Sequence, residues 1–235
     1  MVKRTGVFDE AEGKTDCMRM RRKPNLNKRI ERCGSLLVTE PQTLKGRWLS
    51  QFGSDRLHLE LGCGKGSFTV ATAKENKDAL LVALEKVDNV LVIALERALS
   101  ENPQNVRFLC NLADDLTDFF DNGEVSRIYI NFCDPWPARR HAKRRLTGSP
   151  FLELYKSVLC DGGEIHFKTD NLALFEFSLI EFDRSGFILS EVSRNLHEFG
   201  PCGIMTDYEM KFHGEGQPIY RCVATQKGFE KDVCL

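Results

Sequence analysis

The sequence lacks the cysteine patterns that indicate a metal centre or a disulfide framework. Its nine cysteines are an odd number at wide and irregular spacings, with no Cys-x-x-Cys pair and no Cys-x-x-His pair. Zinc sites and the disulfides of small secreted domains normally show short, regular spacings. We therefore expect a protein that holds no metal ion and works in a reducing compartment.

Long hydrophobic runs are also absent. The longest apolar runs, such as residues 90–95, are far too short to cross a bilayer, and residues 1–14 contain no apolar core of signal-peptide length. No internal repeat or low-complexity tract stands out among the 235 residues. These absences predict a soluble cytoplasmic protein without a membrane partner.

Net charge is nearly absent as well, because 33 Lys and Arg residues face 34 Asp and Glu residues. A chain without an overall positive field binds nucleic acid only if its charges are segregated. Five of the seven residues 139–145 are Lys or Arg, and residues 19–32 contain seven basic residues and one acidic residue. Two such stripes favour a large polyanion as partner, and a solvated charge run is the alternative interpretation.

From Arg56 onward, short apolar runs alternate with segments of helical period, which is typical of a parallel sheet covered by helices on both faces. The expected strands are residues 56–61, 79–84, 106–110, 127–132 and 164–168. The expected helices are residues 67–75, 87–100, 112–120, a helix capped by Ser149 that ends before Gly162, and a helix capped by Asp170 that ends near Arg184.

The pattern changes after Gly186. Residues 187–192 and 219–224 read as strands without a clear crossover helix between them, which favours an antiparallel pair at one edge of the sheet. We expect one α/β domain over residues 46–235, preceded by a basic and partly flexible arm over residues 1–45.

A glycine-rich turn, in the sequence LELGCGKG, follows the first expected strand. Gly62, Gly64 and Gly66 would permit positive φ and close approach of the backbone to a ligand. Glu60 precedes the turn, and Glu85 follows the second strand about 20 residues later, where an acid can accept hydrogen bonds from ribose hydroxyls. The pattern indicates a nucleoside ligand, with a helix-packing turn and two solvated carboxylates as the alternative.

The glycine spacing and the charge of the turn narrow the choice of nucleoside. A dinucleotide site requires Gly-x-Gly-x-x-Gly, but here the third glycine comes one residue early and Glu60 would repel pyrophosphate. A ligand that carries an ammonium and a sulfonium group is compatible, which indicates S-adenosylmethionine and disfavours a nicotinamide-dependent dehydrogenase. Asn111, at the end of the third strand, is a candidate for an adenine contact or a turn former.

The segment NFCDPWPARRHAKRRL, residues 131–146, joins a strand to a stiff turn and a basic cluster. Pro135 and Pro137 fix φ at about −65° and extend the residues before them, so Asp134 and Trp136 should lie on a rigid corner. Trp136 is equally suited to stacking on a base and to packing. The adjoining cluster is suited to phosphate contact.

Together, these motifs closely resemble those of the bacterial tRNA (guanine-N7)-methyltransferase family. The resemblance rests on LELGCGKG, LEK, NFCDPWPARRHAKRRLT, HFKTDN, TDYEMKF and GQPIYR, which occur in order within roughly residues 19–224. It implies a doubly wound, mostly parallel seven-stranded sheet of the Rossmann-like methyltransferase type. It also implies S-adenosylmethionine as methyl donor and a guanine in the variable loop of tRNA as acceptor.

The resemblance further implies roles for individual residues. It implies cofactor contacts at Glu60, Glu85 and Asp134, with Asp134 also as the active-site residue. The glycine turn and the end of the third strand add Gly62, Gly64 and Asn111 to the expected cofactor contacts. Substrate or RNA contacts are expected at Arg140, His141, Lys143, Arg144, Arg145, Asp170, Thr206, Asp207, Tyr208 and Glu209. A plain helix cap at Asp170 and a capped loop helix at residues 206–209 are the alternatives. The chain departs from its relatives at Ala138, where they often carry Lys, and near Leu112, where Asn111 or Asp114 replaces the usual acidic residue.

The chemistry of guanine constrains these roles. N7 has a lone pair and no proton, so methylation needs no general base and positioning should dominate. Asp134 can stabilise the positive charge that methylation places on the base, and Asp170 or Glu209 can read its Watson–Crick edge. The alternatives are an RNA methyltransferase that acts on an exocyclic amine and a non-catalytic RNA-binding module. Either a monomer or a homodimer is compatible with the sequence.

Overall fold

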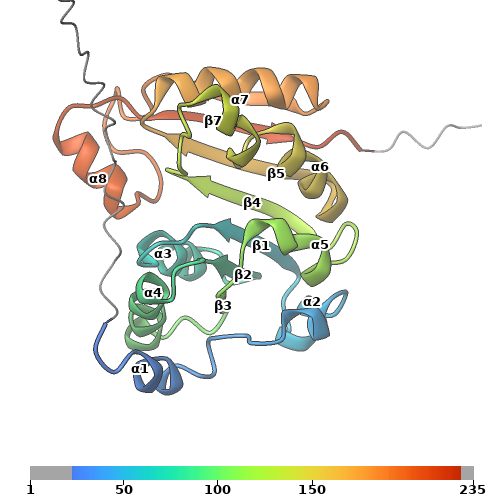
Figure 1. The fold of residues 1–235 in the computed structure, drawn as a ribbon, viewed down its shortest axis with the longest axis vertical. Coiled ribbons are helices and arrows are strands. Elements are labelled where there is room, and N and C mark those ends of the chain that lie inside the picture. Colours follow the sequence, from blue (N-terminus) through green and yellow to red (C-terminus); the bar gives the residue numbers. More distant parts are fainter. Residues whose placement is uncertain (1–22, 229–235) are drawn as a thin grey trace, which may run out of the picture.

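A computed structural model describes residues 23–228 and shows a seven-stranded sheet of order β3-β2-β1-β4-β5-β7-β6 (Figure 1). The strands are β1 (Arg56–Leu61), β2 (Ala79–Leu84), β3 (Val106–Leu109), β4 (Val125–Asn131), β5 (Leu159–Thr169), β6 (Ile188–Ser193) and β7 (Tyr220–Thr225). Strands β1 to β5 run parallel, whereas β7 pairs antiparallel with both β5 and β6. The expected mostly parallel sheet with an antiparallel edge pair is confirmed.

Helices cover both faces of this sheet (Figure 1). The α-helices are α1 (Leu26–Arg32), α2 (Trp48–Phe52), α3 (Ser67–Glu75), α4 (Asp88–Glu101), α5 (Leu116–Phe119), α6 (Ser149–Val158), α7 (Leu172–Arg184) and α8 (Asp207–Gly214). Short 3-10 helices are η1 (Pro41–Leu44), η2 (Ala113–Asp115) and η3 (Arg139–Arg144). Helix α1 packs on α4, which packs on α3, while α6 packs between α5 and α7.

Two hydrophobic cores lie on opposite faces of the sheet, because successive side chains of a strand point in opposite directions. In β2, Leu80 and Val82 join one core with residues of α5, α6 and α7. The intervening Leu81 and Ala83 join the other core with residues of α3 and α4. Every position of β2 is buried, as expected for a central parallel strand covered on both faces.

The third glycine of the turn after β1 allows two helices to pack closely. Gly66 has a φ of 75° and precedes α3, and a Cβ atom built on it would lie 2.8 Å from Cβ of Ala94 in α4. This distance is shorter than any normal contact between carbon atoms. Gly66 therefore serves the α3–α4 contact, which corrects the expectation that it gives a ligand access to the backbone.

Several expected boundaries were wrong, and glycine and cap signals explain the errors. Gly162 and Gly163 lie inside β5, which already begins at Leu159, so they do not mark the end of a helix. Gly148 rather than Ser149 is the N-cap of α6, and Asn171 rather than Asp170 caps α7 by accepting a hydrogen bond from the backbone of Leu174.

A further segment differs from the expectation. The expected helix at residues 112–120 is divided into η2 and α5. Between β6 and β7 lies α8, which agrees with the alternative of a capped loop helix beginning at residues 206–209. Helix α8 begins with a capping box, in which Thr206 accepts from the backbone of Glu209 and the Glu209 side chain accepts from the backbone of Thr206. It lies beside the carboxyl end of β4 (Figure 1).

The described part of the expected N-terminal arm packs against the domain. Arg29 of α1 donates two hydrogen bonds of 2.6 Å to Glu96 of α4. Residues 36–38 then run beside β3, where Phe108 donates to the carbonyl of Leu36 and accepts from the amide of Val38. Residues 1–22 of the expected arm, with the first part of its basic segment, lie outside the described residues. The expected partial flexibility of residues 1–45 stays a prediction. Within residues 23–228, no helix is long and apolar enough to span a bilayer.

Candidate active site

A cavity of about 610 Å³ lies at the carboxyl ends of β1, β2, β3 and β4. This volume is in the range of small-molecule sites, and open α/β sheets bind ligands where the strand order reverses, which here is between β1 and β4. The expected site residues that line the cavity are Gly62, Gly64, Glu85, Asn111, Asp134, Lys143, Arg144 and Tyr208. The topology therefore brings together residues from five separate parts of the sequence.

The glycine turn leaves its backbone open towards a ligand. Gly62 and Gly64 have φ values of 80° and 56°, and a Cβ atom at either position would meet nothing within 4 Å. The carboxylate of Glu85 is fixed beside them, because Gly64 N donates to its Oε2 at 3.2 Å and Val87 N donates to its Oε1 at 2.9 Å. The turn thus offers close backbone approach next to an oriented acceptor.

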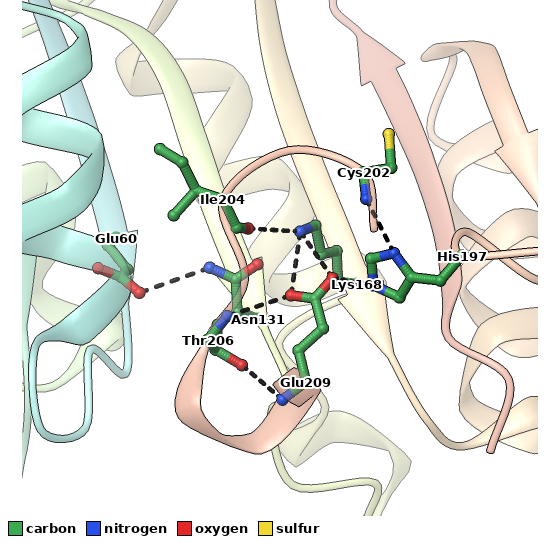
Figure 2. A network of polar contacts seen from close by, with 8 residues as sticks. All are labelled: Glu60, Asn131, Lys168, His197, Cys202, Ile204, Thr206 and Glu209. Carbon is green, nitrogen blue, oxygen red and sulfur yellow. Dashed lines mark hydrogen bonds and ion pairs between the residues drawn. The ribbon is translucent and has the colours of Figure 1, made fainter. Parts of the chain in front are cut away.

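Glu60 lies beneath this turn and does not itself line the cavity. Its buried carboxylate accepts a hydrogen bond from Thr69 Oγ1 at 2.5 Å. It accepts another from Asn131 Nδ2 at 3.4 Å, which Figure 2 shows. Burial raises the pKa of Glu60 to about 7, although the hydrogen bonds from Thr69 and Asn131 oppose this rise. Asn131 does line the cavity. It therefore lies between the open space and the carboxylate of Glu60, which was expected to contact the cofactor directly.

Asp134 lies on the turn after β4, in the same cavity as the glycines. Its side chain is 67% exposed, and its Oδ2 lies 3.7 Å from Nζ of Lys86, another cavity residue. The backbone is left-handed on both sides of this turn, with a φ of 53° at Phe132 and 42° at Trp136. Such conformations cost about 1–3 kcal/mol each in residues other than glycine, so the surroundings must hold them.

The half-buried side chain of Arg145 holds this turn. Its Nε lies 3.1 Å from the carbonyl oxygen of Pro135, and its Nη2 donates to that of Trp136 at 3.0 Å. The guanidinium also lies over the ring of Phe177 at 4.3 Å. Arg145 was expected to contact RNA; its guanidinium binds the backbone of the turn, and an RNA contact by the same side chain stays a prediction.

The other members of the basic cluster lie in or beside η3 and are more open. Arg140, Lys143 and Arg144 are exposed, and the last two line the cavity. Arg144 lies over the Trp136 ring at 5.0 Å, and His141 meets the same ring edge-on at 5.7 Å. The structure therefore places a positive surface at the mouth of the cavity.

Of the four expected contact residues 206–209, only Tyr208 reaches the cavity. Its side chain is exposed, and its ring stacks on that of Phe132 with centroids 6.5 Å apart. Thr206 is the buried cap of α8, while Asp207 lies 3.6 Å from Arg97 of α4. Glu209 is fully buried and accepts from Lys168, which corrects its expected role as a reader of the substrate.

Other residues were expected in the site or were missed. Asp170 is exposed after β5 and does not line the cavity. Asn111 and Asp114 both line the cavity, so both stay candidates for the contact with the adenine of the cofactor. Asn131 and Lys86 were missed, although the carboxyl ends of parallel strands are where ligand contacts gather. No three His, Cys, Asp and Glu side chains in the described part of the chain are placed to hold a metal ion.

Comparisons with known proteins agree on a methyltransferase. A family described as putative methyltransferase matches residues 54–222. A tRNA (guanine-N(7)-)-methyltransferase of Lysinibacillus sphaericus is 47% identical over 207 residues, which are 87% of this chain and 96% of the relative. The protein of that name from Bacillus subtilis is 47% identical over 206 residues, which are 87% of this chain and 97% of the relative.

Solved structures show the same fold at low sequence identity. The 16S rRNA methyltransferase KamB is 17% identical with a TM-score of 0.59, and the match covers 76% of this chain and 92% of that one. A 16S rRNA (adenine(1408)-N(1))-methyltransferase from Catenulisporales acidiphilia, solved with its cosubstrate, is 10% identical with a TM-score of 0.58. That match covers 80% of this chain and 93% of the other. The Rossmann-like methyltransferase fold is therefore shared.

Proposed function

The chain belongs to the tRNA (guanine-N(7)-)-methyltransferase family, and we propose that its substrate is a guanine in the variable loop of tRNA. The enzyme transfers a methyl group from S-adenosylmethionine to N7 of a guanine in tRNA, as the motifs of the sequence implied. One observation carries the assignment of the site, namely that Asp134, the open glycine turn and Tyr208 line a single cavity.

The glycine turn and Glu85 fit the nucleoside part of the cofactor. Gly62 and Gly64 leave open space where any side chain would intrude, and Glu85 presents a carboxylate already oriented by two backbone amides. When bound, S-adenosylmethionine supplies an electrophilic methyl group on a sulfonium. The carboxylates of Glu85 and Asp134, which both line the cavity, give it the negative character that suits a cation.

Asp134 is the residue that we assign to the reacting base. N7 of guanine attacks with its lone pair, so no proton has to be removed and the protein has to orient the base. The purine ring becomes positively charged as the new bond forms, and the nearby carboxylate of Asp134 stabilises that charge. The left-handed residues Phe132 and Trp136 and the hydrogen bonds from Arg145 keep this carboxylate at the mouth of the cavity.

The exposed basic residues beside the cavity are suited to the tRNA backbone. Arg140, Lys143 and Arg144 can neutralise phosphates next to the entry point of the base, which gives binding that weakens as salt is raised. The exposed ring of Tyr208 is suited to stacking on an unpaired base. We further propose that the protein is cytoplasmic, that residues 1–45 form a basic arm, and that it acts as a monomer or a homodimer.

The direct test is incubation with radiolabelled S-adenosylmethionine and unmodified tRNA, followed by chemical cleavage at the labelled base. Cleavage distinguishes N7 methylation, which makes the purine ring labile, from methylation of an exocyclic amine, which does not. We expect labelled, cleavable guanine in the variable loop and no label in a tRNA whose variable-loop guanine is replaced by adenine. Transfer to another position would overturn the proposed location, and no transfer at all would overturn the activity.

A further inference from the structure

A buried ion pair outside the cavity joins β5 to α8. Nζ of Lys168 donates to both carboxylate oxygens of Glu209, at 3.0 and 3.1 Å, and to the carbonyl of Ile204 at 3.0 Å (Figure 2). The side chains of Lys168 and Glu209 are 11% and 0% exposed. Burial lowers the pKa of Lys168, and the charge of Glu209 opposes this change.

His197 completes the cluster. Cys202 N donates to Nδ1 of His197 at 3.1 Å, so the proton of the neutral ring lies on Nε2, which donates to Glu209 at 2.9 Å. Thr206 N donates to the other carboxylate oxygen at 3.2 Å. A carboxylate has about four acceptor positions, and all are used. Glu209 therefore has no acceptor left for a guanine.

The segment that this cluster holds has no buried apolar side chain, and Ile204 is only partly buried against the core beside α3 and α4. Among residues 194–218, the only buried residues are His197, Thr206 and Glu209, all members of the cluster. Segments are normally fixed by buried apolar side chains, and a buried charge is costly without its partner. The ion pair with Lys168 therefore supplies the most deeply buried contact that fixes α8, beside the ring contacts of Tyr208 and Phe212 with Phe132.

Helix α8 in turn forms one wall of the active site. Tyr208 precedes Glu209 in the chain, and its ring lies in the cavity, stacked on Phe132 at the start of the turn that carries Asp134. A displacement of Glu209 would move Tyr208 away from the entry point of the base. It would leave the cofactor side intact, because Gly64 and Glu85 have no contact with this cluster among the hydrogen bonds of the described residues.

We propose that Lys168 and Glu209 are positioning residues for the RNA substrate, which hold α8 so that Tyr208 faces the purine to be methylated. The proposal rests on the proposed function and adds to it. It assigns a role to Lys168, which no cavity contact would reveal, and it replaces a direct guanine contact at Glu209 with an indirect one.

The test compares Lys168→Met, Glu209→Met and the double variant, with Lys74→Met as a control that removes the exposed ion pair with Glu101. Each single variant leaves one buried charge unpaired, whereas the double variant places two apolar side chains in the same space. We expect kcat/KM for tRNA to fall about 100-fold in each single variant, because small displacements of reacting groups have effects of this size. Affinity for S-adenosylmethionine, measured by calorimetry, should change by no more than about twofold.

The double variant separates positioning from contact. If the pair positions α8, kcat/KM for tRNA in the double variant should exceed that of Glu209→Met by about tenfold or more, since no unpaired charge remains. A double variant whose kcat/KM for tRNA does not exceed that of Glu209→Met would overturn the proposal. A Lys168→Met variant with the kcat/KM of the wild type would overturn it as well. The comparison of Glu209→Met with the double variant suffices if Lys168→Met does not fold. An inactive wild-type enzyme would instead contradict the proposed function.

Discussion

Replacing Arg145 by Gln should reduce turnover without weakening the binding of tRNA. Arg145 belongs to the basic cluster, but its guanidinium donates to the carbonyls of Pro135 and Trp136 and lies over Phe177. Its hydrogen bonds therefore stabilise the turn that carries Asp134. An RNA contact at this position would predict the opposite outcome, which makes the substitution informative.

The size of the effect follows from two opposing contributions. A hydrogen bond that involves a charged group contributes about 1.5–3 kcal/mol, and the left-handed backbone at Trp136 costs about 1–3 kcal/mol. In Arg145→Gln the hydrogen bonds of the guanidinium are lost, and their contribution is as large as the cost of the left-handed backbone at Trp136. The turn should therefore relax towards extended backbone. A displacement of about 1 Å can reduce a rate about 100-fold, and we expect a decrease of this order in kcat.

The assay is single-turnover methylation of tRNA, combined with filter binding over a series of salt concentrations. Arg140→Gln is the matched control, because Arg140 is exposed in the same cluster. The control should weaken binding and lower the salt dependence by about one phosphate contact, with kcat unchanged. Arg145→Lys should remain defective, since an ammonium lacks the planar fork of N–H groups that bonds both carbonyls and lies over Phe177. Weakened tRNA binding with normal kcat in Arg145→Gln would refute the reasoning.

Three further predictions concern other parts of the structure. Asp134→Ala should lower turnover by about 100-fold or more while tRNA affinity is kept, and a loss of affinity that accounts for the whole decrease in kcat/KM would contradict this. Burial raises the pKa of Glu60 from 4.5 to about 7, so its stabilising contribution is fully present below pH 4.5 and lost as pH rises through 7. The Tm of the wild type should therefore fall relative to that of Glu60→Gln between pH 5 and pH 8, and parallel Tm curves would refute it. Gly66→Ala should destabilise the fold by about 1–3 kcal/mol in urea through its clash with Ala94, more than Gly53→Ala, which has a similar φ but open space around it. Equal losses would show that the helix contact is unimportant.

The sequence was sufficient to predict the strands of the sheet, because the spacing of apolar residues along the chain shows which side chains are buried. β1, α3 and β2 begin and end at the expected residues. The start of β5 was missed because Gly162 and Gly163 lie in an irregular region, where the pairing passes from Val125 with Leu159 to Arg127 with Glu164. Glycine permits such an irregularity as readily as it ends a helix, so the sequence alone does not distinguish the two.

The site was predictable where a motif places a residue at the end of a strand. Glu85, Asn111 and Asp134 each follow a strand and meet in one cavity, as expected from parallel topology. The partners of Glu209 and Arg145 were not predictable from spacing. Lys168 is 41 residues from Glu209, and the pairing becomes visible only when β5 and α8 are placed together.

Both edges of the sheet are protected against adding another strand. Residues 36–38 satisfy backbone groups of β3 at one edge, and at the other the β6–β7 register is interrupted between Ser190 and Ser193. Glu191 adopts a left-handed conformation within that interruption. Exposed regular edges recruit strands of other molecules and promote aggregation, whereas bulges and charged residues hinder this. These features disfavour fibrillar assembly in a concentrated solution of the enzyme, and they favour helices or loops over a continuous intermolecular sheet for any pairing of two copies.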